Sequence, residues 1–311
     1  MNPCCVFCRV FRLQAILCLF WASAFAQHLT APSYGPCCVA FYSSGPAFTD
    51  QQKLIIFPDE RTTAEVHLPF ALGRFAWSQD GLSIFAEKIW TPKSQALQQG
   101  FYRIQFNPTR ASMVPIRSLN PYNGIAASAV NGHLFVSGEY DSGPSRMCGV
   151  FWADQSNDSV KVLLKSDCGY ASAWFSLSVS PDGTRVVGIH QRMLEIIDVM
   201  TVKTRLMGDD FVKAAWSPDG RWVAALESKR PTRTVLFNAT QLTRVKTLPS
   251  SDIVWSPDSR YLLRTNSAGC SGDSGTFETI DIATGARRVI ESSRCKVYQP
   301  TAAWISRGVL P

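Results

Sequence analysis

A short turn motif recurs along the chain and constrains its fold more than any other feature. Its clearest copies read Val179-Ser180-Pro181-Asp182-Gly183, Trp216-Ser217-Pro218-Asp219-Gly220 and Trp255-Ser256-Pro257-Asp258-Ser259. Degenerate copies begin at Trp77, Ser128 and Trp304. Ser, Pro, Asp and Gly in this order are the preferences of a type I β-turn. Each copy therefore predicts a tight hairpin between two strands.

A second element follows the turns at a variable distance. It is an apolar strand that ends at Asp or Asn with a Thr soon after, as in Glu278–Gly285, Ile196–Thr201 and Leu236–Thr240. A short alternating strand then completes a unit of four antiparallel strands, which we label a to d. The turns recur about every 37 to 51 residues, a period typical of propeller blades.

The ends of the chain supply the number of blades. Three strands without a preceding motif are expected at 39–42, 53–57 and 64–68, and a single strand at 301–304. The C-terminal strand can complete the N-terminal blade and so protect its edges. We therefore expect an all-β fold, a six-bladed β-propeller of four-stranded antiparallel blades, closed by pairing of the N- and C-terminal strands. It occupies residues 27–311 as a single domain.

The Trp-Ser-Pro-Asp-Gly turns and the downstream Asp281-Ile282-Ala283-Thr284-Gly285 give the chain a family resemblance. It resembles the TolB-type family of WD-like β-propeller repeats, which occurs in many exported bacterial proteins. The resemblance covers about residues 75–308. It implies the fold and an exported protein, because the shared residues build the blade while ligand sites vary between members.

The N-terminus has the three parts of a signal peptide. Arg9 and Arg12 precede the apolar run Leu13–Trp21, which is too short to cross a bilayer as a helix, and small residues follow up to Ala26. We expect cleavage of residues 1–26, a mature chain that begins at Gln27 without a membrane span, and a periplasmic or secreted location.

Six cysteines remain after this cleavage, an even number that suggests disulfides in an exported chain. The strand order places Cys148 and Cys168 at the same end of one blade, and Cys270 and Cys295 at the same end of another. We predict these two pairs as disulfides. For Cys37 and Cys38, a vicinal disulfide, free thiols and pairing elsewhere remain open.

The chain is mildly basic, with a formal net charge of +7. Its Lys and Arg residues are scattered, and they form only short pairs such as Lys229-Arg230 and Arg287-Arg288. A nucleic-acid binder concentrates its basic residues on one face. We therefore interpret these charges as solvated surface and expect no nucleic-acid partner.

No catalytic or metal-binding motif stands out. The string Cys270–Gly275 is similar to the segment around the nucleophile of trypsin-like serine proteases, but no histidine has the matching context, and we interpret it as a b to c loop. His-Glu-x-x-His, paired Cys-x-x-Cys and glycine-rich phosphate loops do not occur. Turn formation explains the recurrent Asp residues, and packing between blades explains the recurrent Trp residues. We expect no cofactor and no metal.

Two classes of function are consistent with these sequence features. The preferred hypothesis is a non-catalytic, monomeric binding scaffold for a protein, peptide or glycan. The alternative is a secreted propeller-type enzyme, such as a lyase, lactonase or glycan hydrolase, with its site over the central channel. Variable loops on a rigid scaffold tend to carry binding residues. We therefore place the site on the b to c loops, with these candidates: Trp90, Lys93, Tyr140, Arg146, Asn266 and Asp273.

Overall fold

Strands dominate the part of the chain that the computed structural model describes. The described residues are 38–43, 53–57, 64–70, 72–77, 83–88, 101–106, 110–113, 119–127, 133–141, 146–154, 159–168, 174–256, 258–266, 274–294 and 302–305. They belong to one unit of the chain, Pro36–Pro311. Among them, no helix has the length and apolar character that a membrane span requires. The predicted signal peptide and the start at Gln27 lie outside these residues.

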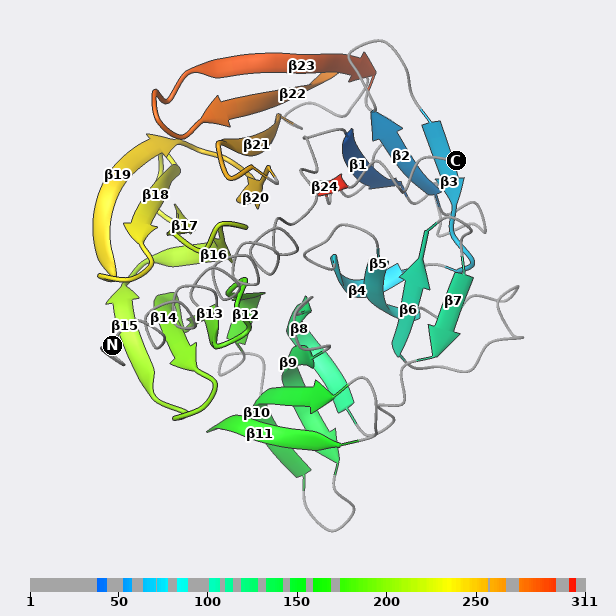
Figure 1. Cartoon of the computed structure of the whole chain (residues 1–311), viewed down its shortest axis with the longest axis vertical. Coiled ribbons are helices and arrows are strands. Elements are labelled where there is room, and N and C mark those ends of the chain that lie inside the picture. Colours follow the sequence, from blue (N-terminus) through cyan, green and yellow to red (C-terminus); the bar gives the residue numbers. More distant parts are fainter. Residues whose placement is uncertain are drawn as a thin grey trace, which may run out of the picture. The chain divides into compact units, whose positions relative to one another are not determined.

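Five antiparallel sheets each consist of four consecutive strands, ordered as in the chain. The first two are β4 (Leu72–Trp77), β5 (Ser83–Lys88), β6 (Phe101–Gln105) and β7 (Arg110–Met113), and β8 (Leu119–Ala127), β9 (His133–Asp141), β10 (Arg146–Asp154) and β11 (Val160–Ser166). The third is β12 (Trp174–Val179), β13 (Arg185–His190), β14 (Met193–Asp198) and β15 (Thr204–Gly208). The fourth is β16 (Phe211–Trp216), β17 (Trp222–Glu227), β18 (Arg233–Asn238) and β19 (Thr243–Pro249), and the fifth is β20 (Val254–Trp255), β21 (Tyr261–Asn266), β22 (Ser274–Asp281) and β23 (Arg287–Arg294). The expected all-β propeller is therefore confirmed, and Figure 1 shows these sheets as its blades.

The remaining strands come from opposite ends of the described chain and share one sheet. These are β1 (Cys38–Ser43), β2 (Lys53–Phe57), β3 (Ala64–His67) and β24 (Ala302–Ile305). They pair in the order β24-β1-β2-β3. Val39 lies opposite Trp304, and Phe41 lies opposite Ala302. The sheet therefore joins segments that are more than two hundred residues apart in sequence.

Burial differs between the strands of a blade. The central strand β13 is buried along most of its length and β17 through its middle, and both read as continuous apolar runs rather than as alternating ones. Such runs indicate a sheet that is covered on both faces. The last strands, β15 and β19, are mostly exposed and carry Thr, Arg and Lys. In Figure 1 these last strands lie at the rim of the propeller.

The hydrophobic core lies between neighbouring blades. One cluster joins Val187 and Ile196 of the β12–β15 blade to Trp216, Val223 and Phe237 of the β16–β19 blade. Another joins Leu236 and Leu248 of that blade to Trp255, Leu262 and Ile280 of the next. Trp216 and Trp255 are only 5% and 7% exposed. At these two positions the repeated Trp therefore packs between blades, as its place in the repeat predicts.

Side-chain hydroxyls also connect the innermost strands of neighbouring blades. Ser178 Oγ accepts a hydrogen bond from the Trp216 backbone at 3.0 Å, and Ser176 Oγ accepts one from the Ala214 backbone at 3.0 Å. The Trp255 indole donates to the carbonyl oxygen of Ala215 at 3.1 Å. Buried polar groups are costly unless they are paired, so these contacts fix how one blade lies on the next.

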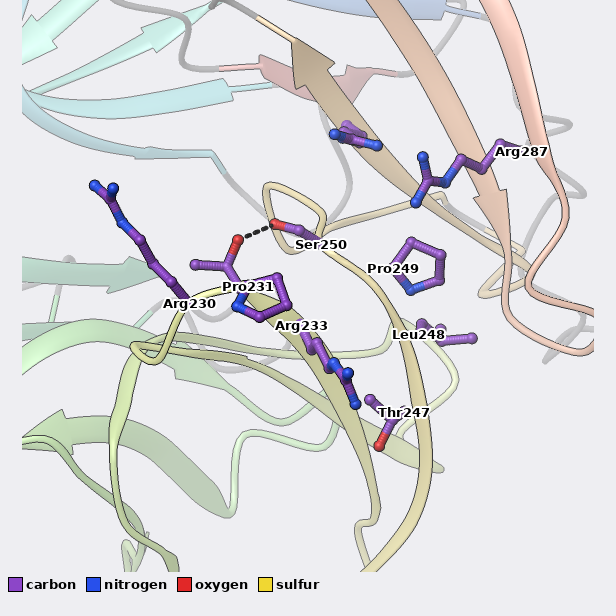
Figure 2. Close-up of a pocket in the computed structure, with 10 residues that line it drawn as sticks. Arg230, Pro231, Arg233, Thr247, Leu248, Pro249, Ser250 and Arg287 are labelled. Carbon is purple, nitrogen blue, oxygen red and sulfur yellow. Dashed lines mark hydrogen bonds between the residues drawn. The ribbon is translucent and has the colours of Figure 1, made fainter.

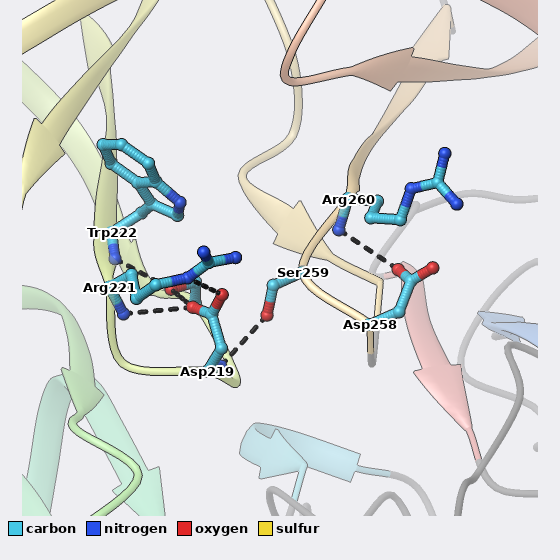
Figure 3. Close-up of polar contacts among 7 residues, drawn as sticks. Asp219, Arg221, Trp222, Asp258, Ser259 and Arg260 are labelled. Atoms are coloured by element: carbon cyan, nitrogen blue, oxygen red, sulfur yellow. Dashed lines mark hydrogen bonds and ion pairs between the residues drawn. The ribbon is translucent and has the colours of Figure 1, made fainter.

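The repeated turns have the predicted hydrogen-bond pattern. The amide of Gly220 donates to the carbonyl oxygen of Ser217 at 2.9 Å, and Ser217 Oγ donates to Asp219 Oδ1 at 2.6 Å. Asp219 Oδ1 also accepts from the Arg221 amide at 3.0 Å. Figure 3 shows this turn beside that of the next blade, whose Ser259 Oγ accepts from the Asp219 amide at 3.0 Å. The motif therefore closes its own hairpin and also contacts the neighbouring blade.

A disulfide joins Cys148 on β10 to Cys168, which follows β11. The two Cα atoms are 5.1 Å apart. This is the pairing that the strand order predicts, because β10 and β11 are neighbours in the sheet. The second predicted pair, Cys270 and Cys295, lies outside the described residues.

Replacing Gly220 by Ala should destabilise the fold through the backbone alone. Gly220 has a φ of +73°, and a Cβ there would come no closer than 3.6 Å to Pro181. An L-residue in this conformation costs about 1–2 kcal/mol. We therefore expect Gly220→Ala to lower the free energy of unfolding by about 1 kcal/mol in a urea titration. Gly220→Asn, which tolerates this φ better, should lose less, and equal losses would contradict the explanation.

Removing the disulfide should destabilise the protein, because the unfolded chain would be less constrained and would gain entropy. The bridge closes a loop with a sequence separation of 20 residues. In the chain-entropy model, a loop of this size is worth roughly 3 kcal/mol. The double variant Cys148→Ser/Cys168→Ser should therefore unfold at lower urea concentration than the wild type. Reduction should destabilise the wild type by roughly 3 kcal/mol more than it destabilises the variant, because only the wild type has this bridge to lose.

Candidate functional site

The candidate residues predicted from sequence fall largely outside the described side chains. Trp90, Lys93 and Asp273 lie outside the described residues, as do Cys37, Cys270 and Cys295. Tyr140 is the second-to-last residue of β9, and Arg146 is the first residue of β10. Their backbones lie at adjacent register positions, because Tyr140 pairs with Met147 and Asp141 with Arg146. Asn266 is the last residue of β21 and pairs with Thr276. The binding roles of all six candidates remain predictions.

A pocket of about 830 Å³ lies between the β16–β19 and β20–β23 blades. The first blade contributes the loop from β17 to β18 and the end of β19, and the second contributes one residue each from β21 and β23. The lining residues are Arg230, Pro231, Thr232, Arg233, Thr247, Leu248, Pro249, Ser250, Arg264 and Arg287. Figure 2 shows these residues, with the side chain of Arg230 extending away from those of Arg233 and Arg287. Ligand sites typically have volumes of this order.

Hydroxyl pairs hold the two loops that form one wall of this pocket. Thr232 Oγ1 donates to Ser250 Oγ at 3.1 Å, the contact that is dashed in Figure 2. Deeper in the blade, Thr234 Oγ1 and Ser251 Oγ are 3.0 Å apart, and Thr234 Oγ1 also accepts from the Ser251 amide at 3.0 Å. The β17 to β18 loop and the connection after β19 lie at the same end of the blade. These hydrogen bonds therefore hold the two segments of this wall together.

The neighbouring blade presents the opposite wall with one face of its sheet. Arg264 lies opposite Glu278, which in turn lies opposite Val289. Side chains alternate between the faces of a strand, so Arg287, two residues before Val289, points to the same side. Leu248, which is buried, packs in the same interblade cluster as Leu262 and Ile280. The floor of the pocket is thus apolar, while its sides carry the guanidinium groups.

Four arginines and no acidic residue line this pocket. Arg264 is paired, because its Nη1 lies 3.4 Å from Glu278 Oε2, and its side chain is 26% exposed. Arg230, Arg233 and Arg287 are exposed, and within the described part of the structure their guanidinium groups have no acidic partner. Guanidinium groups bind carboxylate, sulfate or phosphate through paired hydrogen bonds. The pocket is therefore suited to an anionic ligand.

The pocket offers no side chain for acid–base or nucleophilic chemistry beyond Thr and Ser hydroxyls. Its lining contains no His, Cys, Asp or Glu. Among the described residues of the whole chain, no group of three or more His, Cys, Asp or Glu could hold a metal ion. The expected absence of a cofactor is not tested by these observations. What the arrangement can do chemically is bind and orient anionic groups.

The repeated turn carboxylates do not form a second site in the described blades. Asp182, Asp219 and Asp258 each accept a short hydrogen bond from the Ser two positions earlier, at 2.6 Å in every case. Asp198 and Asp281 similarly accept from Thr201 and Thr284 at the turns between strands c and d. Each carboxylate is thus used to close its own turn, which supports the interpretation made from sequence.

Hydrogen bonding favours the ionised form of Asp182, Asp219 and Asp281. Partial burial of Asp219 favours its neutral form, but hydrogen bonds from Ser217 and Arg221 outweigh this effect and hold the pKa below its ordinary value. The same balance, with Ser180 and Thr184 as donors, lowers the pKa of Asp182. For Asp281 the leading cause is the backbone hydrogen bond from Thr284, which lowers its pKa.

Sequence reasoning missed the arginine-lined pocket. It treated Lys229-Arg230 and Arg287-Arg288 as scattered surface pairs, but the fold brings Arg230 and Arg287 to one pocket. The residues are far apart in sequence and lie on different blades. The available signal was the Lys229-Arg230-Pro231-Thr232-Arg233 run in a b to c loop, the loop class already expected to carry binding residues.

No family model matches the sequence, and no curated protein matches it. Solved structures match the fold. A chain in a crystal structure of a nidogen/laminin complex aligns with a TM-score of 0.57 at 12% identity, covering 86% of this chain and 97% of that one. A protein described as TolB from Agrobacterium tumefaciens aligns with a TM-score of 0.52 at 13% identity, covering 83% and 90%.

A third match extends the range of proteins with this fold. It is a protein described as a 6-phosphogluconolactonase from Bacteroides uniformis, with a TM-score of 0.50 at 12% identity, covering 84% of each chain. At such low identities the similarity shows the β-propeller fold alone. It does not choose between a binding scaffold and an enzyme.

Acid should weaken the protein partly through the turn carboxylates. The folded pKa of Asp219 lies below that of the unfolded chain, so ionised Asp219 stabilises the fold above an unfolded pKa of about 4. This contribution is lost as the pH falls through the folded pKa. Asp219→Asn should therefore be less stable near neutral pH and should lose less stability on acidification, as measured by urea titrations across the acidic range. The exposed Asp209→Asn is a control that removes the same charge outside the repeated turns. An unchanged acid dependence in Asp219→Asn would argue against this role.

Proposed function

We propose that this chain is an exported, non-catalytic binding scaffold whose loops at one end of the propeller hold a protein, peptide or glycan. The observation that carries the proposal is the arginine-lined pocket, which combines a cationic lining with no acid–base or nucleophilic pair. Its position between two packed blades supports a preformed site. A rigid scaffold that presents loops is a common arrangement for binding.

The location and the architecture belong to the same proposal. The disulfide between Cys148 and Cys168 favours an oxidising compartment, and so supports a periplasmic or secreted protein with residues 1–26 removed. We infer a monomeric, closed ring of six blades, with β24, β1, β2 and β3 as the sixth. The pairing of β1 with β24 supports this closure.

The structural matches support binding only by showing that a protein with this fold occurs in a complex. Nidogen occurs in a complex with laminin, and the matched chain of that complex shares the fold of this protein. The lactonase-like match keeps a propeller-type enzyme as the alternative. Such an enzyme would need His or acidic side chains that converge from several blades. In the described region, His190 instead stacks on Trp174 within one blade, with ring centroids 5.1 Å apart.

Binding and turnover assays on the same preparation separate these two functions. Immobilised mature protein should retain a saturable partner from an envelope or culture-supernatant fraction, and the purified partner should bind the free protein in solution. The same protein should show no turnover of panels of sugars, lactones and peptides. The heat-unfolded chain is the control for non-specific capture. A robust rate that a single loop substitution removes would overturn the proposal.

A further inference from the structure

We propose that the arginine-lined pocket recognises an extended acidic peptide segment of a partner protein. This inference rests on the proposed binding function and deepens it by naming the chemistry of the ligand. Three features of the pocket carry it: guanidinium groups without acidic partners, a wall fixed by hydrogen bonds, and the free edge of a strand beside them.

The charges define what the pocket can accept. Arg230, Arg233 and Arg287 face no acidic side chain of the described chain, and Glu278 offsets only Arg264. The guanidinium groups that line the pocket attract a ligand that carries several negative charges, although that of Arg230 extends away from those of Arg233 and Arg287 in Figure 2. Each planar group can bind one carboxylate through two parallel hydrogen bonds. A run of Asp and Glu side chains supplies such carboxylates at a regular spacing.

The wall beside these charges is fixed before a ligand arrives. Thr232 is hydrogen-bonded to Ser250, and Thr234 is hydrogen-bonded to Ser251. These contacts hold the Arg230–Arg233 segment to the connection after β19. Lys246 Nζ on β19 also donates to the carbonyl oxygen of Ile282 at 3.1 Å, which holds the two blades together. A site that is ordered in advance loses less conformational entropy on binding.

The adjacent strand edge favours a peptide over other polyanions. β19 is the last strand of its sheet, so one edge of its backbone has no neighbouring strand within that sheet. Thr247, Leu248 and Pro249 of this strand line the pocket. An extended peptide can pair with such an edge through its own amide and carbonyl groups, while its side chains reach pockets on either side. A sulfated glycan has the charge but lacks this backbone pattern.

The size of the pocket agrees with a short segment. About 830 Å³ falls within the range of sites for small ligands and is too small for a folded domain. Leu248, Pro249 and Pro231 provide an apolar surface for the methylene groups of Glu side chains. A ligand of a few residues would therefore contact the cationic sides and the apolar floor together.

The test measures binding of a fluorescently labelled hexapeptide of alternating Asp and Glu to the full mature protein, by anisotropy. The double variant Arg233→Gln/Arg287→Gln should weaken binding by about tenfold or more. Arg287→Lys should fall between this variant and the wild type, because it keeps the charge but loses the planar pair of donors. Raising the salt from about 0.1 M to about 1 M should also weaken binding, since the screening length falls from about 10 Å to about 3 Å.

A matched control removes the same charge elsewhere. Lys203→Gln/Arg205→Gln changes two exposed basic residues of the preceding blade, one just before the rim strand β15 and one on it, and this variant should bind the peptide like the wild type. Thermal unfolding checks that each variant is folded. The corresponding Asn and Gln hexapeptide should not bind.

The remaining outcomes are decisive against the inference. Binding that the Arg233→Gln/Arg287→Gln variant retains, or that the control variant loses equally, would show that the pocket is not the site. If a sulfated oligosaccharide binds through these arginines and the acidic peptide does not, the ligand is a glycan and the peptide assignment is wrong. If the peptide fails while a partner from the envelope or supernatant still binds saturably, the scaffold function stands and this inference alone falls.

Discussion

Face-to-face packing of neighbouring blades is the constraint on which the rest of this structure depends. A four-stranded sheet has two faces, and each face of a central blade is covered by a different neighbour. The cluster that joins Val187 and Ile196 to Trp216 and Phe237 shows one such interface. Burial of apolar surface contributes roughly 25 cal/mol per Å², so every interface adds a substantial share of the stability. The central strands are therefore mainly apolar on both sides, and a buried polar side chain among them, such as Thr234, is hydrogen-bonded.

The turns fit this packing because they use their polar groups locally. Ser217 and Asp219 close one hairpin, and the Asp219 amide is bonded to Ser259 of the next blade. A carboxylate that accepts several hydrogen bonds has little capacity left for a ligand or a metal. The repeated motif therefore builds the scaffold, and recognition is left to positions where the repeat does not dictate the side chain.

The arginine-lined pocket occupies such a position, beside the end of the rim strand β19. Arg230, Arg233 and Arg287 are exposed, so their charges contribute little to folding stability. The same exposure leaves their donors available to an anion. Arg264, the most buried of the four, is also the one that an acidic side chain compensates. Uncompensated charge thus lies only where water can solvate it before a ligand binds.

The sequence by itself determined the repeat, the strands and the local chemistry of the turns. The period-two and continuous apolar patterns, the Ser-Pro-Asp-Gly turns and the Cys148–Cys168 pair all depend on residues within one blade, where strand order follows chain order. The pocket could not be predicted from the sequence in this way. Arg230 and Arg287 line one pocket because two successive blades pack at a particular angle and register, and that geometry arises from the whole interblade core rather than from any local motif. Tertiary packing therefore decided where the charge gathers, whereas the sequence alone determined only which residues each blade contributes.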